Sequence, residues 1–197
     1  MTRQTAAPLT RMPISSSAMN LTILVEYATS GRLDLNPPYQ RGDVWSEDQR
    51  IALVYSWMTG ATVPSIIISD RSGDAWSDVD TYDIGKTDKG IWAVVDGRQR
   101  LTTAVMWMRG DFAVPASWFR TDGVETTEDT DDGPYVRFTG LNEIGQNSST
   151  NRTIVPVGIG KFASVRAEAA IYLLLNGGGT PQSDADMANA RRVAEGN

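Results

Sequence analysis

Residues 94–108 read VVDGRQRLTTAVMWM, and this stretch decides how the chain is expected to fold. It begins at the end of a short apolar run typical of a buried strand, and it continues with the spacing of an amphipathic helix. Gly97 stands at the turn between them, where a glycine allows a positive φ or a close approach of a ligand. The same turn carries Asp96, Arg98 and Arg100, which is more charge than a strand-to-helix connection requires.

Helix polarity offers an explanation for this charge. The first backbone N–H groups of a helix have no partner within it, and the helix dipole is positive there, so an anion is favoured. The guanidinium groups of Arg98 and Arg100 can pair with phosphate oxygens, but without an anion they are electrostatically unfavourable at that end. The alternative is that Asp96 caps the helix and pairs with one arginine while the other is solvated.

The rest of the chain alternates short apolar runs with amphipathic segments. Helices are expected within residues 20–33, 46–60 and 101–110, with two more in residues 161–196, and strands over residues 62–70, 91–95 and 135–138. Strands that alternate with helices but are interrupted by polar loops indicate one α+β domain with a small mixed sheet flanked by helices.

The clearest of these helices lies in residues 46–60. Ser46 and Gln49 have the spacing of a capping box, and Gly60 ends the segment. Its apolar positions are expected to form one stripe facing the core, namely Ile51, Val54, Tyr55 and Met58.

Length and composition predict how the chain is divided into segments. The chain has 197 residues, enough for one core, and we expect a flexible polar arm over residues 1–18 followed by a single domain over residues 19–197. Residues 121–134 contain six carboxylates and no positive side chain, which predicts a flexible acidic loop. Residues 71–90 are rich in Gly, Asp, Ser and Thr, which predicts a long loop or a hairpin around residues 81–90.

The residue types that the chain lacks exclude several kinds of catalytic and metal-binding site. The chain has no cysteine and no histidine, which excludes disulfides, zinc sites, thiol nucleophiles, Ser-His-Asp triads and histidine-metal nucleases. A metal would need oxygen ligands, which points to magnesium or calcium. The net charge of -6 argues against a broad basic surface, although not against a local basic pocket. No apolar run has the length of a membrane span or a secretory signal, so we expect a cytoplasmic protein.

Two further constellations are candidates for the same pocket. Tyr39, Gln40 and Arg41 either anchor a loop to the core or add polar contacts and a third guanidinium group. Residues 176–181 read NGGGTP, which is either a helix cap with a linker or a turn whose backbone amides approach a ligand. Spacing alone does not bring either of them near Asp96.

The order of these blocks carries a resemblance. PPYQRGDVW, VPSIII, VVDGRQRLTT and LLLNGGGTPQSDADMANA follow one another between about residue 33 and residue 190. This order resembles the N-terminal domain of the GmrSD-type modification-dependent restriction enzymes. That family is described as ParB-like or sulfiredoxin-like and is recognised by a DGQQR motif.

The resemblance implies a ParB/sulfiredoxin-like fold that binds a nucleoside triphosphate (ATP, GTP or CTP) with Mg²⁺. On this basis the catalytic candidates are Asp96, Gln99 and Arg100, with Asp96 also the metal ligand. Tyr39, Gln40 and Arg41 match the family's upstream phosphate-facing block. The residues assigned to the phosphates are Gln40, Arg41, Gly97, Arg98, Thr102, Thr103, Asn176 and Gly178. Arg98 departs from the family motif, which has glutamine at this position.

Three functions are compatible with these features. The first is an enzyme that hydrolyses a nucleoside triphosphate or transfers its phosphoryl group as a kinase, linked to DNA modification or phage restriction. The second is a non-catalytic module that senses nucleotide or modified DNA and partners a separate nuclease. The third is a magnesium-dependent ParB-like nuclease, although the chain has no histidine for the nuclease domain that such enzymes usually carry.

Overall fold

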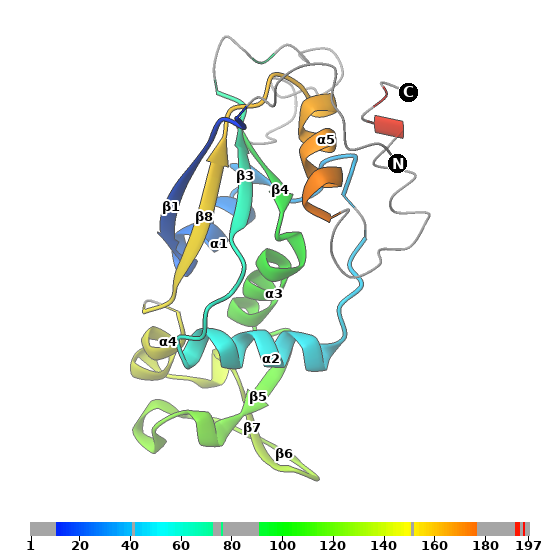
Figure 1. Ribbon diagram of the computed structural model, residues 1–197. Helices are drawn as coiled ribbons and strands as arrows, with labels where there is room; N and C mark the ends of the chain where they lie inside the picture. The colour runs from blue at the N-terminus through cyan, green and yellow to red at the C-terminus, as the bar shows by residue number, and fades with distance from the viewer. Residues whose placement is uncertain are drawn as a thin grey trace.

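The computed structural model describes residues 11–40, 42–72, 76, 91–150, 152–176, 192–193 and 195. Its main sheet has five strands in the order β1-β8-β3-β4-β2 (Figure 1). These strands are β1 (Ile14–Asn20), β2 (Leu33–Asp34), β3 (Ile66–Asp70), β4 (Trp92–Asp96) and β8 (Ile154–Gly160). Strand β3 runs parallel to β8 and antiparallel to β4, so the sheet is mixed, as expected.

A smaller sheet and the helices complete the domain. The small sheet has the order β5-β7-β6 and lies below α2 in Figure 1. Its strands are β5 (Ala113–Pro115), β6 (Glu128–Thr130) and β7 (Gly133–Arg137). The helices are α1 (Leu21–Thr29), α2 (Glu47–Met58), α3 (Arg98–Arg109), α4 (Glu143–Ser149) and α5 (Val165–Asn176). The architecture confirms the α+β class.

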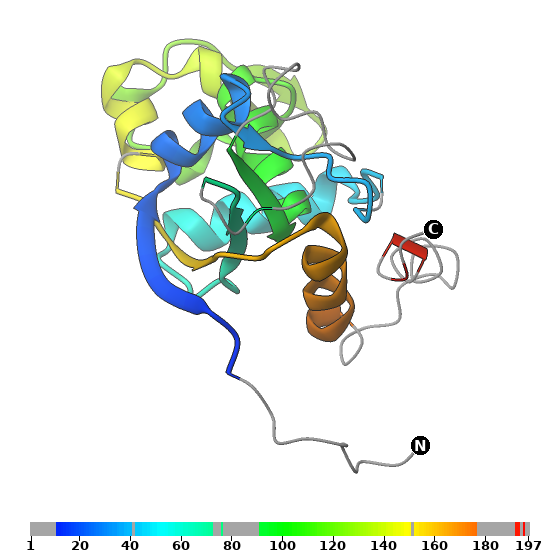
Figure 2. The same cartoon turned by 90° about the horizontal axis from the view of Figure 1, so that it is seen from above.

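The main sheet is covered on both faces. Val94 belongs to the core formed with α1 and α3, whereas its neighbour Val95 packs in a second core with α5. Successive side chains of a strand point to opposite faces, so the helices lie on opposite sides of the sheet, as Figure 2 shows. Burial on both faces explains why β4 is apolar from Trp92 to Val95.

Helix α3 is held in the larger core by Trp107. Its indole is completely buried, and its ring centroid lies 5.8 Å from that of Phe112 and 5.6 Å from that of Phe138. Burying one large aromatic side chain contributes about 1.5–3 kcal/mol to folding. This anchor fixes the helix that follows the Gly97 turn.

In helix α2 the predicted capping box is confirmed, but the predicted apolar stripe is only partly buried. Ser46 and Gln49 exchange hydrogen bonds at the N-terminus. Of the expected stripe only Val54 is fully buried, while Tyr55 is 51% exposed and packs edge-on against Trp118. The buried face also includes Arg50, whose side chain is satisfied by hydrogen bonds and therefore takes a position that an apolar pattern does not reveal.

The flexible arm expected over residues 1–18 is wrong for residues 14–18. These residues form most of β1, which pairs with β8 along its whole length from Ile14 opposite Gly160 to Asn20 opposite Ile154. Backbone pairing orders them although four of the five side chains are serine or alanine.

The flexible acidic loop expected over residues 121–134 is also wrong. A 3-10 helix at Thr121–Gly123 begins this segment, and the β6–β7 hairpin follows. Arg137, just outside the segment, pairs with Glu128 and so supplies the positive charge that the segment lacks. The expected hairpin at residues 81–90 lies outside the described residues, as does most of the expected helix beyond residue 181.

The connection between β4 and α3 is a single residue. Gly97 has φ of 93°, in the left-handed region, and a Cβ atom there would lie 3.0 Å from Ile66 Cγ1 and 3.2 Å from Ile66 Cα. Any other residue would be strained in its backbone and would collide with β3.

Gly97→Ala is expected to destabilise the protein more than Gly60→Ala. Both glycines have a positive φ, but nothing lies within 4 Å of a Cβ at Gly60. Gly60→Ala should therefore cost only the backbone term of about 1–2 kcal/mol, and Gly97→Ala should cost the collision with Ile66 as well. Urea unfolding of both variants measures the difference, and equal losses would contradict this role of Gly97.

Candidate functional site

The N-terminus of α3 has no side-chain cap. Gly97 occupies the capping position, and no acidic residue lies in the first turn. The alternative without an anion had Asp96 capping the helix, and this is wrong because Asp96 makes no capping hydrogen bond. Asp96 Oδ2 instead lies 2.8 Å from Arg100 Nη2, and both side chains are partly exposed. The free N–H groups of the first turn and the helix dipole make this end electropositive.

Both arginines of the turn keep unused hydrogen-bond donors. Arg98 Nη2 donates to Asn36 Oδ1 at 2.6 Å, and Arg100 Nη2 donates to Asp96 and to the Ser65 carbonyl. The Nε atoms of Arg98 and Arg100 are buried and have no partner among the described residues. Among the residues that the structure describes, Asp96 is the one carboxylate paired with these two guanidinium groups.

A pocket of about 130 Å³ opens at this turn. Its lining combines residues from the segment before α2, the β4–α3 turn and α5, namely Gln40, Trp45, Asp96, Gly97, Arg98, Gln99, Arg100, Tyr172 and Asn176. The fold thus brings Gln40 and Asn176 to the DGRQR segment, which spacing alone did not establish. Arg41 and Gly178, also assigned to the phosphates, lie outside the described residues.

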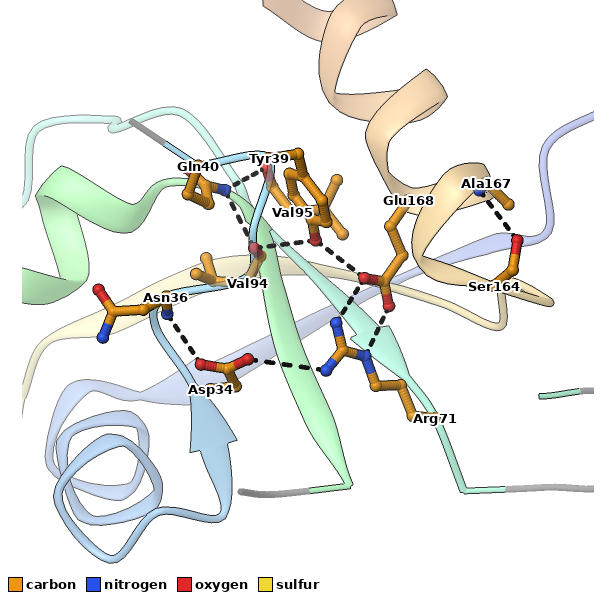
Figure 3. Close-up of polar contacts among 10 residues, drawn as sticks. All are labelled: Asp34, Asn36, Tyr39, Gln40, Arg71, Val94, Val95, Ser164, Ala167 and Glu168. Carbon is orange, nitrogen blue, oxygen red and sulfur yellow. Dashed lines mark hydrogen bonds and ion pairs between the residues drawn. The ribbon is translucent and has the colours of Figure 1, made fainter. Parts of the chain in front are cut away.

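Two glutamines shape the pocket by binding backbone. Gln40 Nε2 donates to the carbonyls of Val94 at 3.0 Å and Val95 at 2.7 Å (Figure 3). Gln99 Nε2 donates to the Gly42 carbonyl at 2.8 Å, which leaves Gln99 Oε1 without a partner among the described residues. The two amides tie the segment before α2 to β4 and α3.

The phosphate assignment of Thr103 is wrong. Its side chain is completely buried, where its hydroxyl donates to the Gln99 carbonyl and accepts from Arg50 Nη1. Thr102 is half-buried and does not line the pocket. Both residues follow the turn by one helical turn, where side chains face the core or the flank of α3.

Arg50 was missed by sequence reasoning. From α2 it donates to Asp43 Oδ2 at 2.6 Å and to the Trp45 carbonyl at 3.1 Å, which holds the loop that carries Trp45 into the pocket. The available signal was a charged side chain inside an otherwise apolar helical face.

Behind the pocket lies a buried ion pair that attaches α5 to the sheet (Figure 3). Arg71 donates to both carboxylate oxygens of Glu168, at 2.8 and 2.6 Å, and neither side chain is exposed. Tyr39 donates to Glu168 at 3.1 Å, and Asp34 lies 3.7 Å from Arg71. The network fixes the helix that brings Tyr172 and Asn176 to the pocket.

Tyr39 therefore does not face a phosphate, contrary to the family-based expectation. Its side chain is completely buried among α5 and β4. Burial raises the pKa of its hydroxyl well above the ordinary value of 10.0, and the neighbouring negative charge of Glu168 raises it further.

The fold and the pocket define a class: a small α+β domain with a basic site at the N-terminus of a helix. The chain belongs to the family of GmrSD restriction endonuclease N-terminal domains, whose family model matches residues 22–192. This membership associates it with DNA restriction. No curated protein and no solved structure matches the chain. Across the described part of the chain, no helix combines the length and hydropathy that a membrane span needs.

Glu168→Gln is expected to lower the free energy of unfolding by roughly 3–5 kcal/mol, because it leaves Arg71 charged and buried without its carboxylate. Arg109→Ala, which removes an exposed pair with Asp111, should leave stability unchanged. Denaturant unfolding compares the two variants. An equally small change in both would show that the buried pair does not hold α5.

The stability contributed by Tyr39 should disappear in alkali. The folded protein keeps this hydroxyl protonated, while the unfolded chain ionises it near pH 10, so the contribution is present below that pH and falls as the pH rises above it. Between about pH 8 and about pH 11 the wild type should lose more unfolding free energy than Tyr39→Phe. Identical pH dependence in the two proteins would contradict the buried position of the hydroxyl.

Proposed function

We propose that this domain binds a nucleoside triphosphate at the β4–α3 turn and hydrolyses it within a DNA restriction system. The observation that carries the proposal is the pair of arginines with unused donors at an uncapped helix N-terminus. One nearby carboxylate balances Arg100, whereas Arg98 has only the neutral Asn36 as a partner among the described residues.

An anion relieves this imbalance. Charge-assisted hydrogen bonds from guanidinium groups to phosphate oxygens contribute about 1.5–3 kcal/mol each, and the helix dipole adds to the attraction. Phosphate oxygens fit the donors around the pocket, which has room for a phosphate group but is smaller than typical sites that enclose whole ligands. Arg98 adds a charge where the family motif has a neutral glutamine.

Asp96 is the residue that would share a magnesium ion with the phosphates. Magnesium is usually held by one or two carboxylates together with substrate phosphates and water. Asp96 is the only carboxylate of the described pocket lining, and the described residues contain no cluster of three potential metal ligands. This donor set fits an ion that arrives with the triphosphate and supplies charge neutralisation.

Hydrolysis requires a group that orients water. Gln99 Oε1 is an acceptor at the pocket with no partner among the described residues, and its amide nitrogen is fixed on Gly42. Gln99 would be the water-positioning residue, with its buried Oε1 reached when the pocket takes up the nucleotide, and Arg100 would stabilise the charge that develops on the phosphate. DNA cleavage itself would fall to a companion nuclease, whose action the nucleotide would control.

ATP, GTP and CTP with magnesium are the test ligands. At least one should raise the melting temperature of the wild type and release phosphate. Arg98→Ala and Arg100→Ala should weaken this binding at least tenfold, as expected for the loss of one charge-assisted contact. Arg109→Ala, at the other end of α3, is the matched control and should bind like the wild type.

The outcomes separate the alternatives. Stabilisation without phosphate release would contradict hydrolysis and leave a nucleotide-sensing module. Phosphate transfer to an added nucleoside in place of water would indicate a kinase. No stabilisation by any nucleotide would refute the site.

A further inference from the structure

A second hollow lies at the other end of α2. It has a volume of about 430 Å³, and an adjoining hollow of about 300 Å³ shares Trp57, Gly60, Arg152 and Thr153 with it. We call the two together the α2 C-terminal groove. It is bounded by the end of α2, residues 118–120, α4 and the start of β8, and it shares no residue with the pocket at the turn. Its size falls within the range of about 300–1,000 Å³ typical of ligand sites.

One side of the groove is aromatic. Trp57, Trp118 and Phe119 line it, and Trp118 is supported by Tyr55 with a ring-centroid distance of 5.2 Å. Trp57 is 6% exposed, and its indole Nε1 has no hydrogen-bond partner among the described residues. This nitrogen has no exposed surface, so Trp57 offers its ring and not its N–H to a ligand in the groove.

The rim of the groove is basic. Arg120 is held by both oxygens of Asp122, at 3.0 and 2.9 Å, and keeps most of its side chain in solvent. Arg152 is exposed and makes no ion pair within the described residues. Two guanidinium groups beside one carboxylate leave local positive charge, in contrast to the net charge of -6 of the chain.

The wall beside the aromatic side chains is built by a close backbone contact. A Cβ atom on Gly145 would lie 2.3 Å from the Gly123 carbonyl oxygen, so only glycine allows α4 to approach the 3-10 helix at this point. Ile144, next to this contact, is 56% exposed at the edge of the groove. The groove is therefore a preformed feature of the packing.

We propose that the α2 C-terminal groove binds a nucleobase together with its adjoining phosphate. Aromatic faces stack on bases, and Arg152 can pair with the phosphate. An uncharged apolar ligand would use only the aromatic side and would leave Arg152 without a counter-charge among the described residues. Free nucleotides and single-stranded polynucleotides present the same chemistry.

Fluorescence anisotropy of a labelled single-stranded oligonucleotide, in competition with the four nucleoside monophosphates, tests the groove. Arg152→Ala removes an exposed donor and Trp57→Phe reduces the aromatic surface while keeping most of the packing, and each should weaken binding about fivefold to tenfold. Trp118→Ala removes a stacking surface and should weaken it about tenfold or more. Melting temperatures establish that each variant is folded, and the two conservative variants keep the test valid if Trp118→Ala unfolds.

Arg98→Ala separates this site from the proposed triphosphate site. It should leave oligonucleotide binding unchanged, while the groove variants should leave triphosphate binding unchanged. If the monophosphates bind as tightly as the oligonucleotide, the ligand is a free nucleotide. If they compete much more weakly, the ligand is a polynucleotide. Absence of binding to both probes, or binding that depends on Arg98 and not on Arg152 or Trp57, would overturn the proposal. Unchanged binding of both probes by groove variants that still fold would also overturn it.

Discussion

The one-residue connection at Gly97 is the constraint on which the site depends. Its left-handed backbone, pressed against Ile66, makes α3 begin where β4 ends and leaves no side chain to cap the helix. Asp96, Arg98 and Arg100 are thereby set around the free N–H groups of the first turn. The segment before α2 then closes over them through Gln40 on β4 and Gln99 on the Gly42 carbonyl.

The elements that follow local rules could be predicted from the sequence. The capping box of α2, the apolar runs of β3 and β4, and the glycine that ends α3 all identify elements that the structure contains. Strand β8 reads IVPVGIG, and its proline and glycines lower its strand propensity. It forms because β1 and β3 pair with it from distant parts of the chain, and β1 itself is mostly serine and small residues.

Part of the pocket lining could be predicted from the ordered set of motifs, whereas the positions that depend on long-range packing could not. Gln40 and Asn176 do line the pocket with the DGRQR segment, but Tyr39 and Thr103 turn into the core, where their hydroxyl groups find buried partners. The Arg71–Glu168 pair joins residues 97 positions apart, and no local pattern reveals it. A charged side chain is buried only where the fold supplies its counterpart.

A crystal structure with magnesium and a non-hydrolysable ATP analogue would locate the triphosphate. We expect phosphate oxygens within hydrogen-bond distance of Arg98, Arg100 and the first backbone N–H groups of α3, with the metal beside Asp96. A triphosphate bound elsewhere, with Arg98 still on Asn36 and Arg100 still on Asp96, would contradict this expectation.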